Sequence, residues 1–362
     1  MLTWIELNKQ NLLYNIQQFK NIAPQSAIWP VVKSNAYGHG VKEVVEILDQ
    51  DKNTTGFMVV NLSEALELAN YTDKNILVLS YFGRAEESLK LAADKKISLP
   101  VCSLECVDYL DSLNKKFLVN IKIDTGTTRL GFAAEESEEI IKYIQNKKNL
   151  SINSIYTHYA ESESANLDFT KQQFELFDNI ASKYPEIKKH SVCSAAAISM
   201  PEAQADMIRL GISLYGLWPS QETKDRNSID LKPVLSWHTK IIQIKNIKAG
   251  QSIGYNRTYK CEQDCKIAIL PVGYYEGYSR SLSNKSQVII KNKKYSVRGN
   301  VCMNLIMIEL PADTDIKVGE VVTLLGRQND QEISVEELAQ LSSTINYEVV
   351  TKINAQLPRV IV

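Results

Sequence analysis

The sequence predicts an α/β protein in which a (β/α)8 TIM-type barrel is followed by a C-terminal, mostly β domain. Up to about residue 217, apolar runs of strand length alternate with amphipathic stretches of helical period. Beyond a polar loop that starts at Trp218 and contains Pro219, the chain becomes mostly strand-like, so we expect a second domain from about residue 229. A chain of 362 residues is also too long for one ordinary core.

The barrel is predicted from eight apolar runs that have the length of buried strands. These runs are Ala27–Val32, Gly56–Val60, Ile76–Leu79, Ile97–Cys102, Phe117–Ile123, Ile152–His158, His190–Cys193 and Met207–Tyr215. Helices are expected between most of them, and several begin with Ser or Asp at a plausible N-cap. The clearest helical stretches are Ser63–Tyr71, Ser103–Leu113, Glu135–Gln145 and Asp168–Ser182. Eight β units with helical returns are typical of a (β/α)8 barrel, although the last return, after Ser194, is short.

The second domain is predicted from runs that are almost all strand-like. They are Val234–Ile244, Ile267–Val272, Gln287–Ile290, Cys302–Glu309 and Val321–Leu325. A hairpin connection is expected at 292–295, where the sequence is Asn-Lys-Lys-Tyr. In this part of the chain we predict a helix only at Val335–Leu341.

Composition and charge exclude several classes of protein. The net charge of −1 and the scattered Lys and Glu residues provide no basic patch for nucleic acid. The longest apolar runs have strand length, so no membrane span is expected, and the N-terminus lacks the pattern of a signal peptide. We therefore expect a cytoplasmic protein. The six cysteines form neither a CxxC motif nor a metal-ligand pattern with histidine, which favours reduced thiols and no metal site.

Lys33 lies where the first predicted strand stops and a polar turn with Gly38 and Gly40 begins. An ammonium group at the inner end of an apolar strand is uncommon unless a neighbouring group removes or compensates its charge. One possibility is a lysine with a lowered pKa that forms a Schiff base with a carbonyl group, as in enzymes that use pyridoxal 5′-phosphate (PLP). The other is a lysine whose ammonium reaches the rim of the sheet, and strand and lysine alone favour this second interpretation.

Catalytic groups of a (β/α)8 barrel belong at the C-terminal ends of its strands. The residues with unusual chemistry fall there: Lys33 and Tyr37 after the first predicted strand, Lys122, Asp124 and Arg129 at the fifth, His158 at the sixth, Ser194 at the seventh, and Arg209, Gly211 and Ile212 at the eighth. A phosphate held after the seventh and eighth strands is a recurrent arrangement. Taken alone, Arg209 would by default be interpreted as part of a salt bridge at the barrel rim.

The segment Val31–Gly40, with the sequence VVKSNAYGHG, closely resembles the cofactor-lysine segment of alanine racemases, a family of PLP enzymes. The resemblance covers the whole chain and includes, in order, Lys33, Arg129, His158, Ser194, Arg209, Tyr255, Met303 and Tyr347. It implies a PLP-binding barrel at residues 9–228 and a β-rich domain at residues 229–362 that also takes in an N-terminal strand at residues 1–8. It further implies interconversion of L- and D-alanine, supply of D-alanine for peptidoglycan, and a homodimer with shared active sites.

The resemblance also implies a role for each matching residue. Lys33 would carry PLP, and its phosphate would be held by Tyr37, Ser194, Tyr347 and the backbone of Gly211 and Ile212. Arg209 would face the pyridine nitrogen with His158 supporting it, whereas Arg129 and the Met303 amide would bind the substrate carboxylate. Lys33 and Tyr255 would be the two acid/base groups on opposite faces of the substrate, Tyr255 coming from the other subunit. Lys122 matches a position that is carbamylated in some relatives, and a plain ammonium is equally compatible with the sequence.

Five residues depart from the family pattern, and two of them, Ser162 and Glu163, replace a more usual Thr-Ala-Asp pattern after His158. Thr128 stands where relatives usually have Gly, Asn300 where they often have Arg, and Asn304 where they usually have Asp. An alternative function is racemisation of serine or of a broad range of amino acids, although the ring of Tyr347 would crowd a larger side chain. A fold-related PLP decarboxylase would place an acid where Arg209 stands, and a non-enzymatic PLP-binding barrel would leave Tyr255 and the second domain unexplained.

Overall fold

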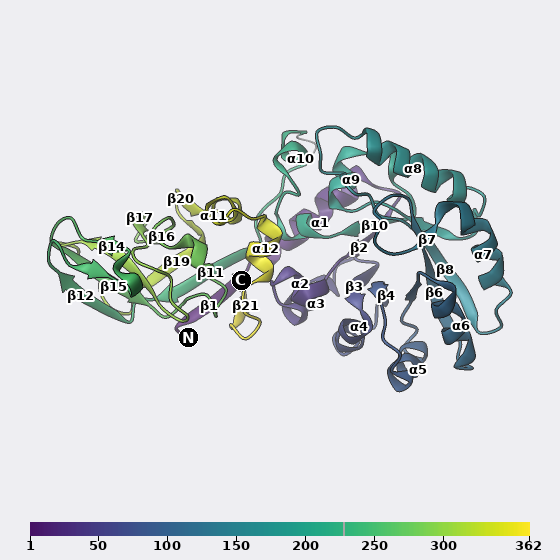
Figure 1. Ribbon diagram of the computed structural model, residues 1–362, viewed down its shortest axis with the longest axis horizontal. Coiled ribbons are helices and arrows are strands. Elements are labelled where there is room, and N and C mark those ends of the chain that lie inside the picture. Colours follow the sequence, from purple (N-terminus) through teal and green to yellow (C-terminus); the bar gives the residue numbers. More distant parts are fainter. Residues whose placement is uncertain (227–228) are drawn as a thin grey trace. The chain divides into compact units, whose positions relative to one another are not determined.

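The computed structural model describes residues 1–226 and 229–362, and these form two compact units (Figure 1). The barrel unit consists of Gln10–Ala36 and Val44–Lys232. The β unit consists of Met1–Lys9, Tyr37–Glu43 and Pro233–Val362. The predicted domain boundary between residues 228 and 229 adjoins residues that lie outside the described part of the chain, and it stays a prediction.

The barrel unit contains a closed ring of eight parallel strands. They are β2 (Ala27–Pro30), β3 (Gly56–Asn61), β4 (Asn75–Tyr81), β5 (Leu99–Val101), β6 (Phe117–Asp124), β8 (Leu150–Tyr156), β9 (Lys188–His190) and β10 (Met207–Leu210). Each is joined to the next by parallel pairing or by an isolated bridge, and β10 pairs with β2 to close the ring. The predicted (β/α)8 barrel is therefore confirmed. It is closed at its seam, so it has no exposed sheet edge.

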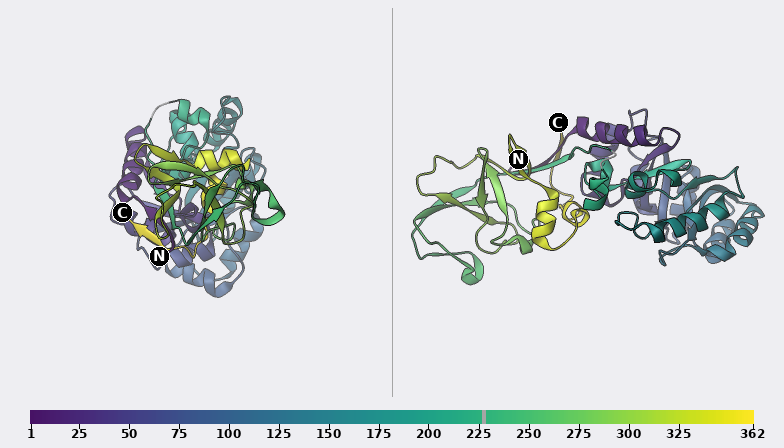
Figure 2. Two further views of the ribbon diagram at one scale, coloured as in Figure 1. Left: turned by 90° about the vertical axis from the view of Figure 1, so that its left-hand side faces the viewer. Right: turned by 90° about the horizontal axis from the view of Figure 1, so that it is seen from above.

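Helices surround this ring, as Figure 1 and the views in Figure 2 show. They include α1 (Lys9–Ile22), α3 (Val41–Leu48), α4 (Leu62–Leu68), α5 (Glu86–Asp94), α6 (Leu104–Ser112), α7 (Ser137–Gln145) and α8 (Asp168–Ala181). Side-chain caps start two of the predicted helices: Asn61 accepts the backbone N–H of Glu64, and Ser103 accepts that of Cys106. Among the described residues, no helix is long and apolar enough to cross a membrane.

Two predicted barrel strands were placed wrongly at their ends. The seventh strand is β9 (Lys188–His190) rather than His190–Cys193, and it is followed by the short helix α9 (Ser194–Ser199). The eighth was expected to reach Tyr215, but β10 stops at Leu210 and a 3-10 turn, η3 (Ile212–Tyr215), follows. The break comes at Gly211, whose φ of −98° and ψ of −113° belong to neither a strand nor a helix.

The β unit has two sheets and a small hairpin. The larger sheet has the order β17 (Lys293–Ser296), β16 (Gln287–Ile290), β19 (Val321–Gln328), β11 (Leu235–Lys240), β1 (Thr3–Leu7), β21 (Arg359–Ile361), with β20 (Gln331–Ile333) beside β19. The second sheet has the order β12 (Gln243–Ile247), β15 (Cys265–Leu270), β18 (Ile306–Pro311), and the hairpin joins β13 (Ser252–Ile253) to β14 (Tyr259–Lys260). The N-terminal strand β1 lies between β11, to which it is antiparallel, and the edge strand β21, to which it is parallel.

A hairpin is present between β16 and β17, but its turn lies at residues 291–292, and residues 293–295 of the predicted connection belong to β17. Lys291 and Asn292 have φ angles of 49° and 63°, the left-handed pair that a tight two-residue hairpin turn requires. The run Val234–Ile244 was expected as one strand, but it divides into β11 and the start of β12, which lie in different sheets. Besides the predicted helix, α11 (Val335–Ser342), the structure has α12 (Asn346–Thr351), which the sequence did not predict. This helix is short, and its N-cap Ile345 provides no side-chain hydrogen bond.

Candidate active site

Lys33 starts a left-handed turn at the end of β2. Ser34, Asn35 and Ala36 have φ angles of 54°, 54° and 52°, and Tyr37 continues the turn with a φ of 53°. The left-handed conformation costs about 1–2 kcal/mol for each residue that is not glycine. A run of four such residues is held only where the surrounding structure compensates, and such strain is typical of functional sites. The sequence predicted a turn with glycines here, but not that residues with side chains would carry the strained angles.

The position of Lys33 lowers the pKa of its ammonium group. Burial is the main cause, and the positive charges of Arg129 and Arg209 lower the pKa further. Glu64 acts in the opposite direction and raises it. A lysine with a lowered pKa has more of the neutral amine that can attack a carbonyl group, which is the chemistry that the sequence motif predicts.

Arg209 is buried in β10, with 5% of its surface exposed, and its guanidinium is held from several sides. It donates to the carbonyl oxygens of His190 at 2.8 Å, Thr157 at 3.0 Å and Ser191 at 2.7 Å, and it lies 3.0 Å from Nδ1 of His190 and 3.2 Å from Nδ1 of His158. Because a guanidinium can only donate, both Nδ1 atoms must accept. The structure thus brings Arg209 and His158 together, as the sequence predicted.

Both imidazoles next to Arg209 are neutral. Burial is the main cause that holds the pKa of His158 and of His190 well below the ordinary value, and the charge of Arg209 adds to it. The hydrogen bonds from Arg209 to Nδ1 then place the ring hydrogen on Nε2 in each case. Arg209 therefore keeps its positive charge while its neighbours carry none.

His190 is a site residue that the sequence analysis missed. Its Nε2 lies 3.0 Å from the hydroxyl of Ser154, which donates to Oδ1 of Asn120 at 2.8 Å. Asn120 in turn donates to the hydroxyl of Ser98 at 2.9 Å, so a chain of buried polar groups crosses the barrel interior from Arg209. Polar residues inside otherwise apolar strands were the available signal, because a buried polar group needs a partner.

Ser194 lies against the turn that follows β10. Its hydroxyl accepts the backbone N–H of Gly211 at 3.0 Å and that of Ser213 at 3.4 Å. With its lone pairs engaged in this way, the hydroxyl can give its own hydrogen to an anion. The residues after Ser194 are buried alanines, Ala195 to Ala197, which leave room near the backbone. The structure thus brings together Ser194, Gly211 and Ile212, the predicted phosphate-binding residues of the barrel unit.

Arg129 is exposed at the end of the loop that follows β6. The carboxylate of Asp124 organises this loop because it accepts the backbone N–H groups of Gly126, Thr128 and Arg129 at 2.9, 3.1 and 3.2 Å. Thr128 has a φ of 54°, which is rare for a β-branched residue. Glycine adopts this angle without strain, so the usual glycine at this position of the family has a direct structural reason.

Lys122 is a second lysine with perturbed chemistry. It is 6% exposed, its Nζ donates to the carbonyl of Ile123 at 3.3 Å, and it lies 5.1 Å from the centre of the Tyr156 ring. Burial and the nearby charge of Arg209 lower the pKa of Lys122 to about 7. About half of the Lys122 side chains are therefore neutral amines at neutral pH.

The other predicted site residues belong to the β unit. The rings of Tyr37 and Tyr347 lie 6.3 Å apart at an angle of 48°. Gly38 allows α12, which carries Tyr347, to come close, because a Cβ atom at Gly38 would lie 1.9 Å from the carbonyl oxygen of Val350. The two tyrosines that were predicted to bind a phosphate are thus neighbours, and the helix that presents one of them is the one that the sequence missed.

Tyr255 and Met303 line one cavity of the β unit, with a volume of about 430 Å³. Tyr255 is 72% exposed, and its carbonyl accepts the side-chain amide of Asn300 at 3.0 Å. The amide of Asn304 donates to Glu276 at 2.8 Å. Both asparagines that depart from the family pattern therefore have hydrogen-bond partners beside the predicted catalytic and substrate-binding residues.

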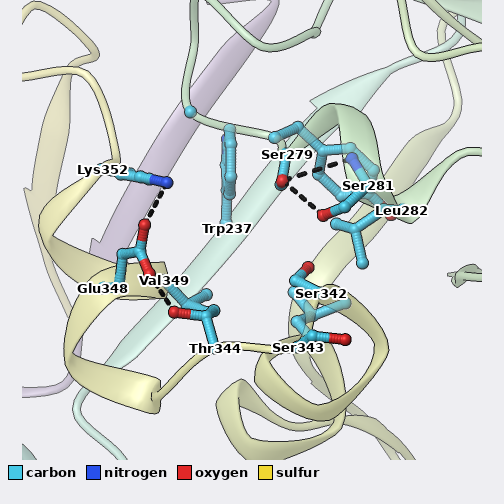
Figure 3. Close-up of a pocket in the computed structure, with 13 residues that line it drawn as sticks. Trp237, Ser279, Ser281, Leu282, Ser342, Ser343, Thr344, Glu348, Val349 and Lys352 are labelled. Atoms are coloured by element: carbon cyan, nitrogen blue, oxygen red, sulfur yellow. Dashed lines mark hydrogen bonds and ion pairs between the residues drawn. The ribbon is translucent and has the colours of Figure 1, made fainter.

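A second cavity of the β unit, about 300 Å³ in volume, contains none of the predicted site residues (Figure 3). Trp237 and several hydroxyl side chains line it, and the ion pair of Lys352 with Glu348 stands at one side. Thr344 also donates to Glu348. This cavity is therefore not part of the candidate site.

Comparison with known proteins identifies the family of this chain. The model of the alanine racemase N-terminal domain matches residues 7–219, and the model of the alanine racemase C-terminal domain matches residues 234–361. The chain belongs to the alanine racemase family. The resemblance that the sequence motifs indicated is therefore confirmed over both parts of the chain.

Relatives and solved structures cover the chain almost completely. An alanine racemase of Carboxydothermus hydrogenoformans is 36% identical over 99% of this chain and 99% of its own length. The structure of an alanine racemase of Clostridium difficile 630 has a TM-score of 0.92 at 34% identity and covers 100% of this chain and 96% of its own. A histidine racemase from Leuconostoc mesenteroides has a TM-score of 0.91 at 27% identity, covering 99% of this chain and 98% of its own.

Proposed function

We propose that the protein is an alanine racemase that uses PLP to interconvert L- and D-alanine. The observation that carries the proposal is Lys33, an amine with a lowered pKa at the end of a barrel strand in the same unit as the buried guanidinium of Arg209. Membership of the family and the full-length relatives named alanine racemase support the reaction.

The residues present fit PLP. A neutral amine at Lys33 suits attachment to the cofactor aldehyde, and the hydroxyl of Ser194 beside the amides of Gly211 and Ser213 suits a phosphate. We assign phosphate binding to Tyr37, Ser194, Tyr347 and the backbone of Gly211 and Ile212, and the ring nitrogen to Arg209. When bound, PLP would withdraw electrons from the substrate and so acidify the hydrogen on its Cα.

Racemisation needs one acid/base group on each face of the substrate Cα. We assign Nζ of Lys33 to one face and Oη of Tyr255 to the other. Because Arg209 can only donate, it would leave the ring nitrogen without a proton, and the negative charge at Cα would be weakly dispersed. The proton must then return quickly from a group that is already in place, which suits racemisation and disfavours slower side reactions. Arg129 and the Met303 amide would hold the substrate carboxylate.

We also propose a homodimer in which Tyr255 serves the active site of the partner subunit. Tyr255 is 72% exposed, and Tyr274 and Met303, which line the same cavity, are exposed as well. Exposed tyrosine and methionine side chains gathered at one place are typical of a surface that another chain covers. The enzyme would work in the cytoplasm and supply D-alanine for peptidoglycan.

A broader amino-acid racemase is the second candidate. The likeness to the histidine racemase of Leuconostoc mesenteroides favours it, because a protein of this fold is named for a substrate larger than alanine. Tyr347, whose ring lies beside that of Tyr37, is the residue that we expect to exclude larger side chains. A decarboxylase has no such support, because a buried arginine rather than an acid occupies position 209.

The test is to incubate the purified protein with PLP and L-alanine in deuterated water and to follow optical activity and deuterium at Cα together. Decay of the optical signal to zero with incorporation of deuterium supports racemisation with two bases. Exchange with retained handedness would contradict the role of Tyr255. Activity on serine or histidine without activity on alanine would favour the second candidate.

A further inference from the structure

The carboxylate of Glu64 joins the strained turn after Lys33 to the end of the neighbouring strand. Its Oε1 accepts the backbone N–H of Ser34 at 2.8 Å, and its Oε2 accepts that of Val60 at 2.9 Å. Ser34 is the first left-handed residue of the turn, and Val60 lies near the end of β3. One side chain therefore fixes two backbone segments that are far apart in sequence.

The start of α4 explains why Glu64 can reach both groups. Asn61 is the N-cap and accepts the N–H of Glu64 at 3.0 Å, which is half of a capping box. In a complete capping box, the Glu side chain would return to the N–H of the N-cap residue itself. Here one oxygen bonds the residue before the N-cap instead, and the other is directed to Ser34. The helix thus supplies a fixed base from which the carboxylate meets the turn.

Both the geometry and the charge of the turn require such a group. Left-handed residues that are not glycine persist only where other contacts compensate their cost, and hydrogen bonds to an ionised carboxylate are among the stronger ones. The same carboxylate opposes the two guanidinium groups, Arg129 and Arg209, that act on Lys33. Its negative charge therefore balances part of the positive charge around the amine.

We propose that Glu64 is a positioning residue for Lys33: by holding the amide of Ser34 it fixes the left-handed turn that presents the lysine, and its charge tunes the protonation of the amine. The proposal rests on the proposed function, in which Lys33 carries PLP and serves as one of the bases.

The first measurement follows backbone amides in the protein without PLP. Glu64→Gln removes the charge and leaves one acceptor oxygen, and Glu64→Ala removes both acceptors. We expect the Ser34 amide to exchange with deuterium about tenfold faster or more in Glu64→Ala, with a smaller effect in Glu64→Gln. Glu67→Gln is the matched control, because Glu67 lies exposed on the same helix. Exchange at Ser34 and Val60 that is the same in all variants would overturn the positioning role.

The second measurement is the pH profile of Lys33 reactivity. The lysines of the PLP-free protein are labelled with an amine-selective acylating reagent between pH 6 and 11 (about the range in which a lysine with a lowered pKa titrates), and the Lys33 peptide is quantified by mass. Because Glu64 raises the pKa of Lys33, the midpoint of labelling is expected at lower pH in Glu64→Gln than in the natural protein or in Glu67→Gln. An unchanged midpoint would overturn the tuning role.

Neither measurement depends on turnover, so the two proposals can fail separately. If the natural protein does not racemise alanine but Glu64→Gln shifts the exchange and the labelling midpoint, the function is wrong and the role of Glu64 stands. If alanine is racemised and neither property changes, the role of Glu64 is wrong. If the pH profile of racemisation by Glu64→Gln shifts together with the labelling midpoint, both proposals are supported.

Discussion

Nη2 of Arg209 lies 3.2 Å from Nδ1 of His158, and in this pair the arginine donates to a neutral imidazole. Among the described residues, no acidic side chain bonds to the guanidinium of Arg209. Its partners are carbonyl oxygens and neutral imidazole rings, so its positive charge is not neutralised. Such an arginine is fixed in place and stays charged across the range in which enzymes work. The predictions below follow from this arrangement and from the lysines around it.

Replacing Arg209 by Lys should lower the free energy of unfolding by about 2–4 kcal/mol, because an ammonium cannot reproduce several charged hydrogen bonds to buried carbonyls. Urea denaturation of the PLP-free protein measures this. Arg84→Lys is the control, since Arg84 pairs with Glu105 at the surface and its loss should change stability by less than about 1 kcal/mol. Equal effects in the two variants would contradict the importance of the buried contacts.

Lys33→Ala should abolish covalent attachment of PLP and reduce racemisation by about 10²–10⁴-fold or more, because we propose the amine as both the attachment point and one base. Mass spectrometry after borohydride reduction detects the attached cofactor. Lys42→Ala replaces a nearby lysine outside the proposed site, so covalent attachment of PLP and the rate of racemisation should both stay unchanged. A reduced adduct that persists in Lys33→Ala would show that another lysine holds the cofactor.

Tyr255→Phe should retain attached PLP and normal stability, since its side chain is largely exposed, but it should lose racemisation. With one face left without its acid/base group, proton exchange should persist for one enantiomer of alanine and fall by about 10²-fold or more for the other. Proton NMR in deuterated water, starting from each enantiomer in turn, measures the two rates. Equal losses for both enantiomers would contradict a base that serves one face.

The stability of the protein should rise with pH from about pH 7 because of Lys122. The pKa of Lys122 is lowered to about 7 in the folded state, whereas an unfolded lysine titrates near 10.4. Between these values the unfolded chain binds the extra proton, so this residue contributes up to about 1.4 kcal/mol for each pH unit. Below pH 7 both states are protonated and the contribution is constant. Denaturation of the natural protein and of Lys122→Met at a series of pH values should show a steeper rise in the natural protein, because the lowered pKa of Lys33 contributes to the rise in both.

Thr128→Gly should raise the free energy of unfolding by about 0.5–1 kcal/mol, because glycine adopts the φ of 54° without the strain of a β-branched residue. The N–H that bonds to Asp124 is retained. Thr127→Gly is the matched control on the adjacent residue. It should be destabilising, since Thr127 donates to the carbonyl of His158. Thermal denaturation of the two variants should therefore move in opposite directions.

The repeating part of the fold was accessible from the sequence because each barrel strand is a separate apolar run. The ends of some strands were predicted wrongly. Ile212–Tyr215 continues the apolar character of β10, so hydropathy cannot reveal the turn that the backbone takes at Gly211. Helix α12 escaped because it is short and lacks a side-chain cap. Local patterns carry little information about such elements, whose stability comes from the tertiary contacts around them.

For the candidate site, the sequence identified residues that we propose to contact the cofactor or the substrate. It did not identify residues that position those side chains. Lys33, Arg209 and Ser194 stand out at strand ends, and motif resemblance added roles for them. His190 and Glu64 instead look like ordinary strand and helix residues, and their importance lies in hydrogen bonds to segments distant in sequence. The left-handed angles of Ser34, Asn35 and Ala36 were also beyond prediction, because none of these residues is a glycine.

The β unit is built from three separate segments of the chain, which affects how the protein is synthesised and whether it can be split into two products. Strand β1 pairs with β11 and β21, which are synthesised much later, because Thr3 lies opposite Thr239 and Ile5 lies opposite Arg359. The segment Tyr37–Glu43, which starts at the last left-handed residue of the turn after Lys33, belongs to the same unit. A C-terminal product that begins at Pro233 would therefore lack β1 and the segment Tyr37–Glu43 of its own unit, whereas the N-terminal product would keep every segment of the barrel unit. During synthesis, β1 therefore stays without its two neighbouring strands until β11 and β21 have been made, and an unpaired strand edge favours aggregation.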